Sequence, residues 1–158
     1  MTWARGKAEV ERLIRDGELE QVTPSREVAD RLLADAAAHV GLATQGIDDD
    51  PSGALQLGYD AARKACAALL AVEGLRATTR GGHIAVIDAV RAQFNDRGGM
   101  QVFGKLHRLR RRRNTTEYPD LESPGITNDD ASQAIETARQ VIDAANRLIA
   151  SGRLDPFR

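Results

Sequence analysis

The chain has 158 residues, a length that corresponds to one domain and leaves little room for a second. Its net charge of −1 excludes a strong field over the whole surface, so a general nucleic-acid coat is not expected, although a local basic patch is compatible with this balance. Aromatic residues make up only 4% of the chain and alanine is abundant, which favours close-packed helices over sheet.

The N-terminal half is predicted to form three helices. Apolar residues recur at helical spacing within residues 3–15, which indicates a short amphipathic helix. Thr23, Pro24 and Ser25 indicate the start of a second, longer helix, with the proline near its first turn. The third follows Asp50 and Pro51, which form a cap and a first-turn proline, and Gly74 can end it.

The C-terminal half is predicted to form three more helices. One covers about residues 84–94, and a glycine pair at 98–99 separates it from a helix over about residues 100–117. Pro119 stops that helix because the residue before a proline disfavours helical backbone, and Thr127 caps the last helix. No segment alternates with period two, so no strand is expected. The pattern predicts a bundle of five or six helices.

Compartment and cofactors can also be predicted. The single cysteine, Cys66, lies in an alanine-rich stretch and is interpreted as a buried hydrophobe; one cysteine forms no internal disulfide, which favours a reducing compartment. The charged N-terminus does not resemble a signal peptide, and no apolar run reaches bilayer length, so we expect a cytoplasmic protein with no membrane segment. The histidines are scattered and no phosphate-binding loop occurs, so we expect no metal and no cofactor.

The segment over residues 103–120 holds four consecutive arginines whose directions differ. On a helical wheel, Arg113 and Glu117 fall within about 20° of the centre of the apolar face, and Arg110 within about 40°. An inward guanidinium is costly unless it is paired. Either Glu117 forms a structural ion pair with Arg113, or the two line a cleft that binds an anion such as an RNA phosphate. Two arginines point to the opposite side and are expected to be solvated: Arg111 and Arg112.

Arg113 and Asn114 resemble the first half of the signature of the HEPN superfamily, which continues with a histidine a few residues later. No histidine occurs at any permitted position here, and Tyr118 stands where the shortest version of the signature places it, so the motif is degenerate. The resemblance covers about residues 25–152. The chain is similar to a bacterial HEPN subgroup in three runs that occur in this order: YDAARKA, GGH, and RRRRN followed by EYP.

The resemblance implies an all-α, up-and-down helical bundle with four main helices plus a short N-terminal helix. We therefore expect an N-terminal helical extension over residues 1–22 and a HEPN-like bundle over residues 23–158. Many HEPN domains pair as homodimers, and the motif arginine and histidine of both copies then meet in a shared cleft. Active members cleave RNA without metal, using the 2′-hydroxyl as nucleophile. Several are toxins beside a nucleotidyltransferase-type antitoxin, whereas others act in binding or assembly.

Cleavage of this kind needs groups that move protons, which imidazole does near neutral pH and tyrosine, with its high pKa, does poorly. Without a motif histidine, the candidates for a catalytic role beside Arg113 and Asn114 are Glu117, Tyr118 and His83. His83 begins a helix after a Gly-Gly pair, and it either replaces the missing histidine or makes a cap or core contact. The expected ligand-binding residues are Arg110, Arg113 and Asn114.

Polar residues on the other helices are interpreted as structural. Tyr59, Asp60 and Arg63 form a polar edge of the third helix, where interhelical hydrogen bonds are favoured over a site. His107 is expected to lie partly exposed at the edge of its apolar stripe, and His39 has no distinguishing neighbour.

Three functions follow from these observations. The first is a non-catalytic or weakly active HEPN domain that binds RNA, a nucleotide or a protein partner, in a toxin-antitoxin or defence context. The second is an active, metal-independent endoribonuclease toxin. The third is a structural or adaptor helical dimer. Because the histidine is missing, the sequence favours the first.

Overall fold

A computed structural model of the chain describes residues 2–95, 101–122 and 124–158. It is built almost entirely of helices, which confirms the predicted all-α fold. Short 3₁₀ turns occur at Thr2–Ala4 and Gln101–Lys105. The regular elements, in chain order, are α1 (Lys7–Arg15), β1 (Leu19–Gln21), α2 (Arg26–Gly46), α3 (Pro51–Glu73), β2 (Leu75–Ala77), α4 (Gly82–Phe94), α5 (Leu106–Glu117) and α6 (Asn128–Ala150).

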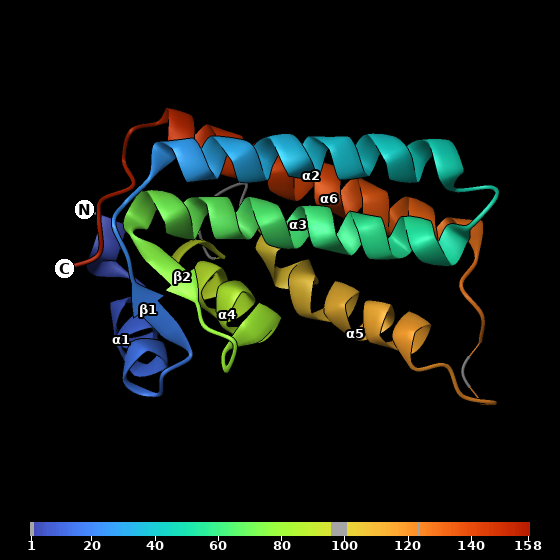
Figure 1. The fold of residues 1–158 in the computed structure, drawn as a ribbon, viewed down its shortest axis with the longest axis horizontal. Coiled ribbons are helices and arrows are strands. Elements are labelled where there is room, and N and C mark those ends of the chain that lie inside the picture. Colours follow the sequence, from blue (N-terminus) through green and yellow to red (C-terminus); the bar gives the residue numbers. More distant parts are fainter. Residues whose placement is uncertain (1, 96–100, 123) are drawn as a thin grey trace.

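The bundle is arranged around α3. Figure 1 shows α3 between α2 and α6 on one side and the shorter α4 and α5 on the other, with α2, α3, α5 and α6 alternating in direction along the chain. The inward side chains of α3 are fully buried at Leu55, Tyr59, Ala62 and Leu69. A Cβ at Gly58 would lie 3.3 Å from the carbonyl carbon of Ala134, so glycine lets α6 approach α3 closely.

Local signals at the helix ends act as predicted. The Ser25 side chain accepts a hydrogen bond from the Val28 amide, and Thr127 caps α6 in a capping box with Asp130. Asp50 accepts a hydrogen bond from the Gly53 amide at 2.9 Å and so caps α3. Gly74 follows that helix with a φ of 74°, a left-handed conformation that glycine adopts without a steric penalty.

Two expectations about secondary structure were wrong. The chain does contain strands: β1 pairs antiparallel with β2, with Leu19 opposite Ala77. Each strand has three residues, too few to show a period of two. In addition, α5 begins at Leu106, because residues 101–105 form the 3₁₀ turn. The predicted glycine break at 98–99 lies outside the described residues.

The β1–β2 pair ties the N-terminal segment to the bundle. The Val22 amide also donates a hydrogen bond to the carbonyl of Gly74, at 2.8 Å, so the chain on both sides of residue 22 is held against the end of α3. The division of the chain at residue 22 stays a prediction. Over the described residues, no helix combines the length and apolarity needed to cross a bilayer.

Candidate functional site

A cavity of about 530 Å³ opens between the C-terminal end of α2, the first half of α3, the start of α4 and the end of α5. Its apolar wall includes Leu42, Ala54 and Leu57, and polar side chains form the other part of the lining. Its volume is typical of a small-molecule site. The polar side chains that line it are Asp50, Gln56, Tyr59, Asp60, His83 and Arg113.

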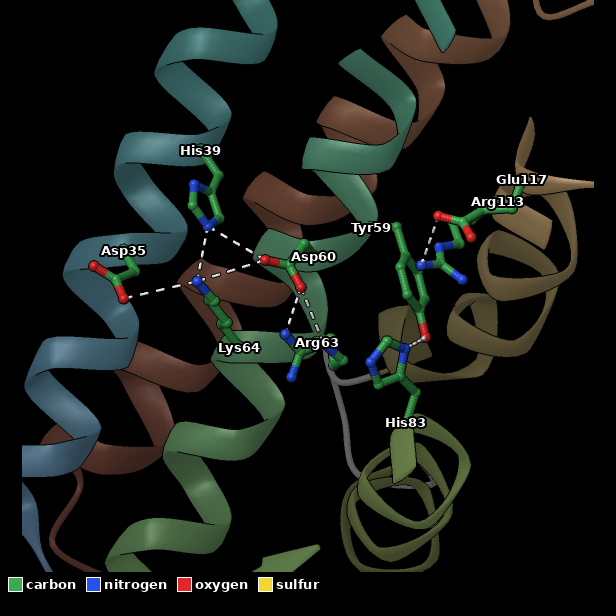
Figure 2. A network of polar contacts seen from close by, with 9 residues as sticks. All are labelled: Asp35, His39, Tyr59, Asp60, Arg63, Lys64, His83, Arg113 and Glu117. Carbon is green, nitrogen blue, oxygen red and sulfur yellow. Dashed lines mark hydrogen bonds and ion pairs between the residues drawn. The ribbon is translucent and has the colours of Figure 1, made fainter. Parts of the chain in front are cut away.

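Arg113 occupies the α5 side of this cavity. Its guanidinium pairs with Glu117 at 3.1 Å and lies over the Tyr59 ring, 5.7 Å from the ring centroid (Figure 2). The side chain is 25% exposed, so the arginine faces inward but is not sealed off. Of the two alternatives that the sequence left open for Arg113, the ion pair with Glu117 forms, and Arg113 also lines a cavity whose lining does not include Glu117. Binding of an anion there stays a prediction.

Tyr59 joins Arg113 to His83. Its hydroxyl oxygen lies 3.2 Å from Nδ1 of His83, and the side chain is 1% exposed. Burial raises the pKa of Tyr59 to about 12, against nearby arginine charges, so the hydroxyl stays protonated at neutral pH. A buried hydroxyl needs an acceptor. We infer that Tyr59 donates to Nδ1, which leaves the proton of a neutral His83 on Nε2 as a hydrogen-bond donor.

The surroundings of His83 favour its neutral form. Burial lowers the pKa of His83, and the positive charges of Arg63, Arg113 and Arg110 lower it further, against the opposing effect of Asp60. Three guanidinium groups thus act on one imidazole. The carboxylates of Asp60 and Glu117 pair with Arg63 and Arg113 and offset part of this positive field. Nε of Arg110 is buried with no hydrogen-bond partner among the described residues, and this arginine, an expected ligand-binding residue, lies outside the cavity lining.

A second polar network lies between α2 and α3 (Figure 2). Asp60 accepts a hydrogen bond from Nε of Arg63 at 3.1 Å and lies 3.3 Å from Nε2 of His39, which is itself 2.8 Å from Nζ of Lys64. Lys64 also pairs with Asp35 at 3.7 Å. Although burial disfavours the charged form of Asp60, Arg63, Lys64 and His39 together hold its pKa below the ordinary value. This carboxylate is therefore neutralised by its own network.

The other residues singled out in the sequence lie outside the cavity lining. Tyr118 is 76% exposed, and Asn114 is half-buried on α5. His107 is bonded to Asp88 at 2.7 Å. Arg111 is exposed as expected, but the expectation for Arg112 was wrong: it donates to Asp130 of α6 at 2.7 Å.

Tyr59 was underestimated from the sequence, where it was assigned to a polar edge. The signal that identifies it is its spacing: it lies four residues after Leu55 and seven before Cys66, both of which are buried on the same face of α3. His39 likewise has charged neighbours that only the packing of α2 against α3 provides.

Cys66 is buried, as predicted, and burial raises the pKa of its thiol to about 12. Within the described ranges, no group of three or more histidine, cysteine or acidic side chains is placed to hold a metal ion.

The environment of His83 predicts a pH dependence of stability. Because its pKa in the folded state lies below the unfolded value of 6.5, the unfolded chain binds more protons between these two values. We expect the contribution of His83 to be complete above pH 6.5 and to be lost as the pH falls through its folded pKa. Urea unfolding of the wild type and of His83→Gln across this range tests it. The prediction is contradicted if the free energy of unfolding of the wild type falls with decreasing pH no more steeply than that of the variant.

Comparison with known proteins adds one finding. The family model for the HEPN domain matches residues 47–148, a span that contains most of the cavity lining, including Tyr59, His83 and Arg113. No curated protein and no solved structure matches the chain.

Proposed function

The chain belongs to the HEPN domain family, and from the geometry of its cavity we propose that it binds RNA, one nucleotide unit at a time, with little or no cleavage. The family supports a role in nucleotide or RNA chemistry at a general level. The observation that carries the specific proposal is the meeting of Arg113, Tyr59 and His83 around one cavity. These residues come from three different helices, and none of them is a neighbour of another in the sequence.

The parts of a nucleotide fit the parts of the cavity. The apolar wall that includes Leu42 and Leu57 suits the face of a base. Arg113 offers a planar, permanently charged guanidinium for a phosphate, and the Nε2 proton of His83 can donate to a second anionic oxygen. Glu117 is 33% exposed, so it can exchange its pairing with Arg113 for water when an anion enters.

The same geometry disfavours catalysis. Cleavage through the 2′-hydroxyl needs a base with a free lone pair. In the tautomer that Tyr59 selects, Nδ1 of His83 is used as an acceptor and Nε2 is already protonated, so no imidazole lone pair faces the ligand. Tyr59 itself is too weak an acid to supply a phenolate at neutral pH.

Binding by wild type and Arg113→Ala tests the proposal. A labelled oligouridylate of about ten nucleotides is titrated in metal-free buffer and followed by fluorescence anisotropy. Loss of a charge-assisted contact, about 1.5–3 kcal/mol, is expected to weaken binding roughly tenfold to a hundredfold. Arg15→Ala removes an exposed arginine on α1 and serves as the control. A lowered melting temperature in Arg113→Ala with unchanged affinity supports the structural role instead.

An active endoribonuclease is the second candidate, and one observation favours it: an imidazole, that of His83, lines the same cavity as Arg113. If the tautomer were reversed, with Nδ1–H donating to the Tyr59 oxygen, Nε2 would become a base. Gel analysis of the RNA recovered from the binding experiment separates the candidates. Robust metal-independent cleavage that both Arg113→Ala and His83→Gln abolish overturns the binding-only proposal.

We also propose a second copy of the chain as a partner. Leu42, on the cavity wall, is 59% exposed, and Ile84, next to His83 in the chain, is 44% exposed, so two large apolar side chains are open to a partner. This supports the homodimer that the family resemblance implies. A nucleotidyltransferase-type antitoxin, a toxin-antitoxin or defence context and a cytoplasmic location stay predictions.

A further inference from the structure

A second cavity, of about 760 Å³, lies on the other side of α5, between α5 and α6. Here it is called the α5–α6 groove and is defined by the residues of those two helices that line it, together with Lys105 just before α5 and Leu55 of α3. The site proposed above does not include it. Arg112 lines this groove whereas Arg113 lines the cavity, because successive residues of an α-helix are rotated by about 100° around its axis.

The groove carries an excess of positive charge. Four cationic side chains line it, Lys105, Arg108, Arg111 and Arg112, against two carboxylates, Asp130 and Glu136. Arg112 and Asp130 neutralise each other at 2.7 Å, and Asp130 also accepts the Thr127 amide at 2.9 Å. Arg108 and Arg111 are exposed and form no hydrogen bond or ion pair with the residues that the structure describes. Both guanidinium groups are therefore available to an incoming ligand.

The uncharged side chains of the groove also suit a polyanion. Gln133, Thr137 and Gln140 repeat along α6 at the spacing of one helix face, opposite Thr115 on α5. These polar side chains extend along about 10 Å of helix. Gln140 donates to Glu136 and accepts from Lys105, each at 3.4 Å, whereas Gln133 and Thr137 offer donors to a ligand. The lining contains no aromatic residue and no methionine, the residues that anchor protein partners. An extended chain of phosphates fits this lining better than an acidic protein does.

We propose that the α5–α6 groove binds the phosphodiester backbone of a single-stranded RNA whose neighbouring nucleotide enters the cavity at Arg113. The choice of RNA over another polyanion rests on the function proposed above, whereas the anionic character of the ligand rests on the groove alone. The groove and the cavity are separated by the width of one helix, about 10 Å. This distance can be spanned by a strand of a few nucleotides. The consecutive arginines of α5 then serve two parts of one ligand.

The experiment compares a groove variant, a control variant and Arg113→Ala, with two nucleotide ligands and one acidic peptide. The groove variant Arg108→Gln/Arg111→Gln and the control Arg15→Gln/Arg31→Gln have the same net charge, and the control replaces exposed arginines of α1 and α2 that are equally unpartnered among the described residues. Each is titrated with the labelled oligouridylate and with uridine monophosphate over a range of salt concentrations. We expect the groove variant to bind the oligonucleotide at least roughly tenfold more weakly than the control. Its log–log salt slope should fall by about 1.4, since each phosphate contact contributes about 0.7 for a single strand.

The two ligands and Arg113→Ala separate the two proposals. Mononucleotide affinity should be unchanged in the groove variant and reduced in Arg113→Ala. The groove proposal is overturned if the groove variant and its control have the same oligonucleotide affinity and the same salt slope. The cavity proposal then stands if Arg113→Ala still weakens binding. Weaker binding in the groove variant alone supports the groove and overturns the cavity. A polyglutamate peptide that binds more tightly than the RNA overturns the assignment of the groove to nucleic acid.

Discussion

Replacing Tyr59 by alanine is expected to destabilise the protein by about 3–5 kcal/mol, the typical cost of truncating a buried aromatic side chain. The ring is 1% exposed and contacts both functional partners: its centroid lies 5.7 Å from that of the His83 ring and 5.7 Å from the guanidinium carbon of Arg113. Its removal therefore opens a void in the wall of the cavity and withdraws the support that positions two side chains.

Tyr59→Phe separates the ring from its hydroxyl. Only the hydrogen bond to His83 is lost, so we expect a loss of about 1 kcal/mol in the free energy of unfolding. Urea unfolding measures both variants. Tyr118→Ala is a matched control because it removes a tyrosine that is 76% exposed, and its effect should stay within about 0.5 kcal/mol. Equal destabilisation by Tyr118→Ala and Tyr59→Ala contradicts the assignment of Tyr59 to the core.

The features that the sequence predicted well are those set by neighbours in the chain. The cap residues Ser25, Asp50 and Thr127 act within one helical turn, so their role is independent of how the helices pack. The inward direction of Arg113 and its pairing with Glu117 also follow from a periodicity that operates inside a single helix. Such local rules apply before any tertiary contact is known.

The features that could not be predicted depend on packing between helices. The Tyr59–His83 hydrogen bond joins residues 24 positions apart, and the Arg112–Asp130 bond joins residues 18 apart. Periodicity within α3 or α5 does not identify either partner. The start of α5 was misplaced for a different reason: residues 101–105 turn with three residues per turn, whereas the wheel assumed 3.6 throughout. The buried Val102 and Phe103 look the same in either geometry.

Gly81→Ala is expected to cost about 3 kcal/mol and to reduce ligand binding as well, because Gly81 is in contact with the turn before β1. A Cβ at this position would collide with the carbonyl of Glu18, whose carbon would be 2.7 Å away, and with the side chain of Ala85. The carbonyl cannot withdraw cheaply, since it accepts the Thr78 amide at 3.0 Å and the Glu18 amide is bound to the Leu13 carbonyl at 2.8 Å.

The adjacent glycine provides the control. Gly82 has a φ of 53°, and a Cβ there would meet nothing within 4 Å, so Gly82→Ala carries only the left-handed strain of about 1 kcal/mol. For a domain of this size, the difference of about 2 kcal/mol corresponds to a melting temperature roughly 4–8 °C lower in Gly81→Ala than in Gly82→Ala. Differential scanning calorimetry of the two variants measures it. Gly81 immediately precedes α4, and His83 lies in the first turn of that helix. The collision at Gly81 should therefore also shift the imidazole away from Tyr59. We expect nucleotide affinity to fall more in Gly81→Ala than in Gly82→Ala. Equal melting temperatures for the two variants contradict the close approach of Gly81 to Glu18 that positions the start of α4.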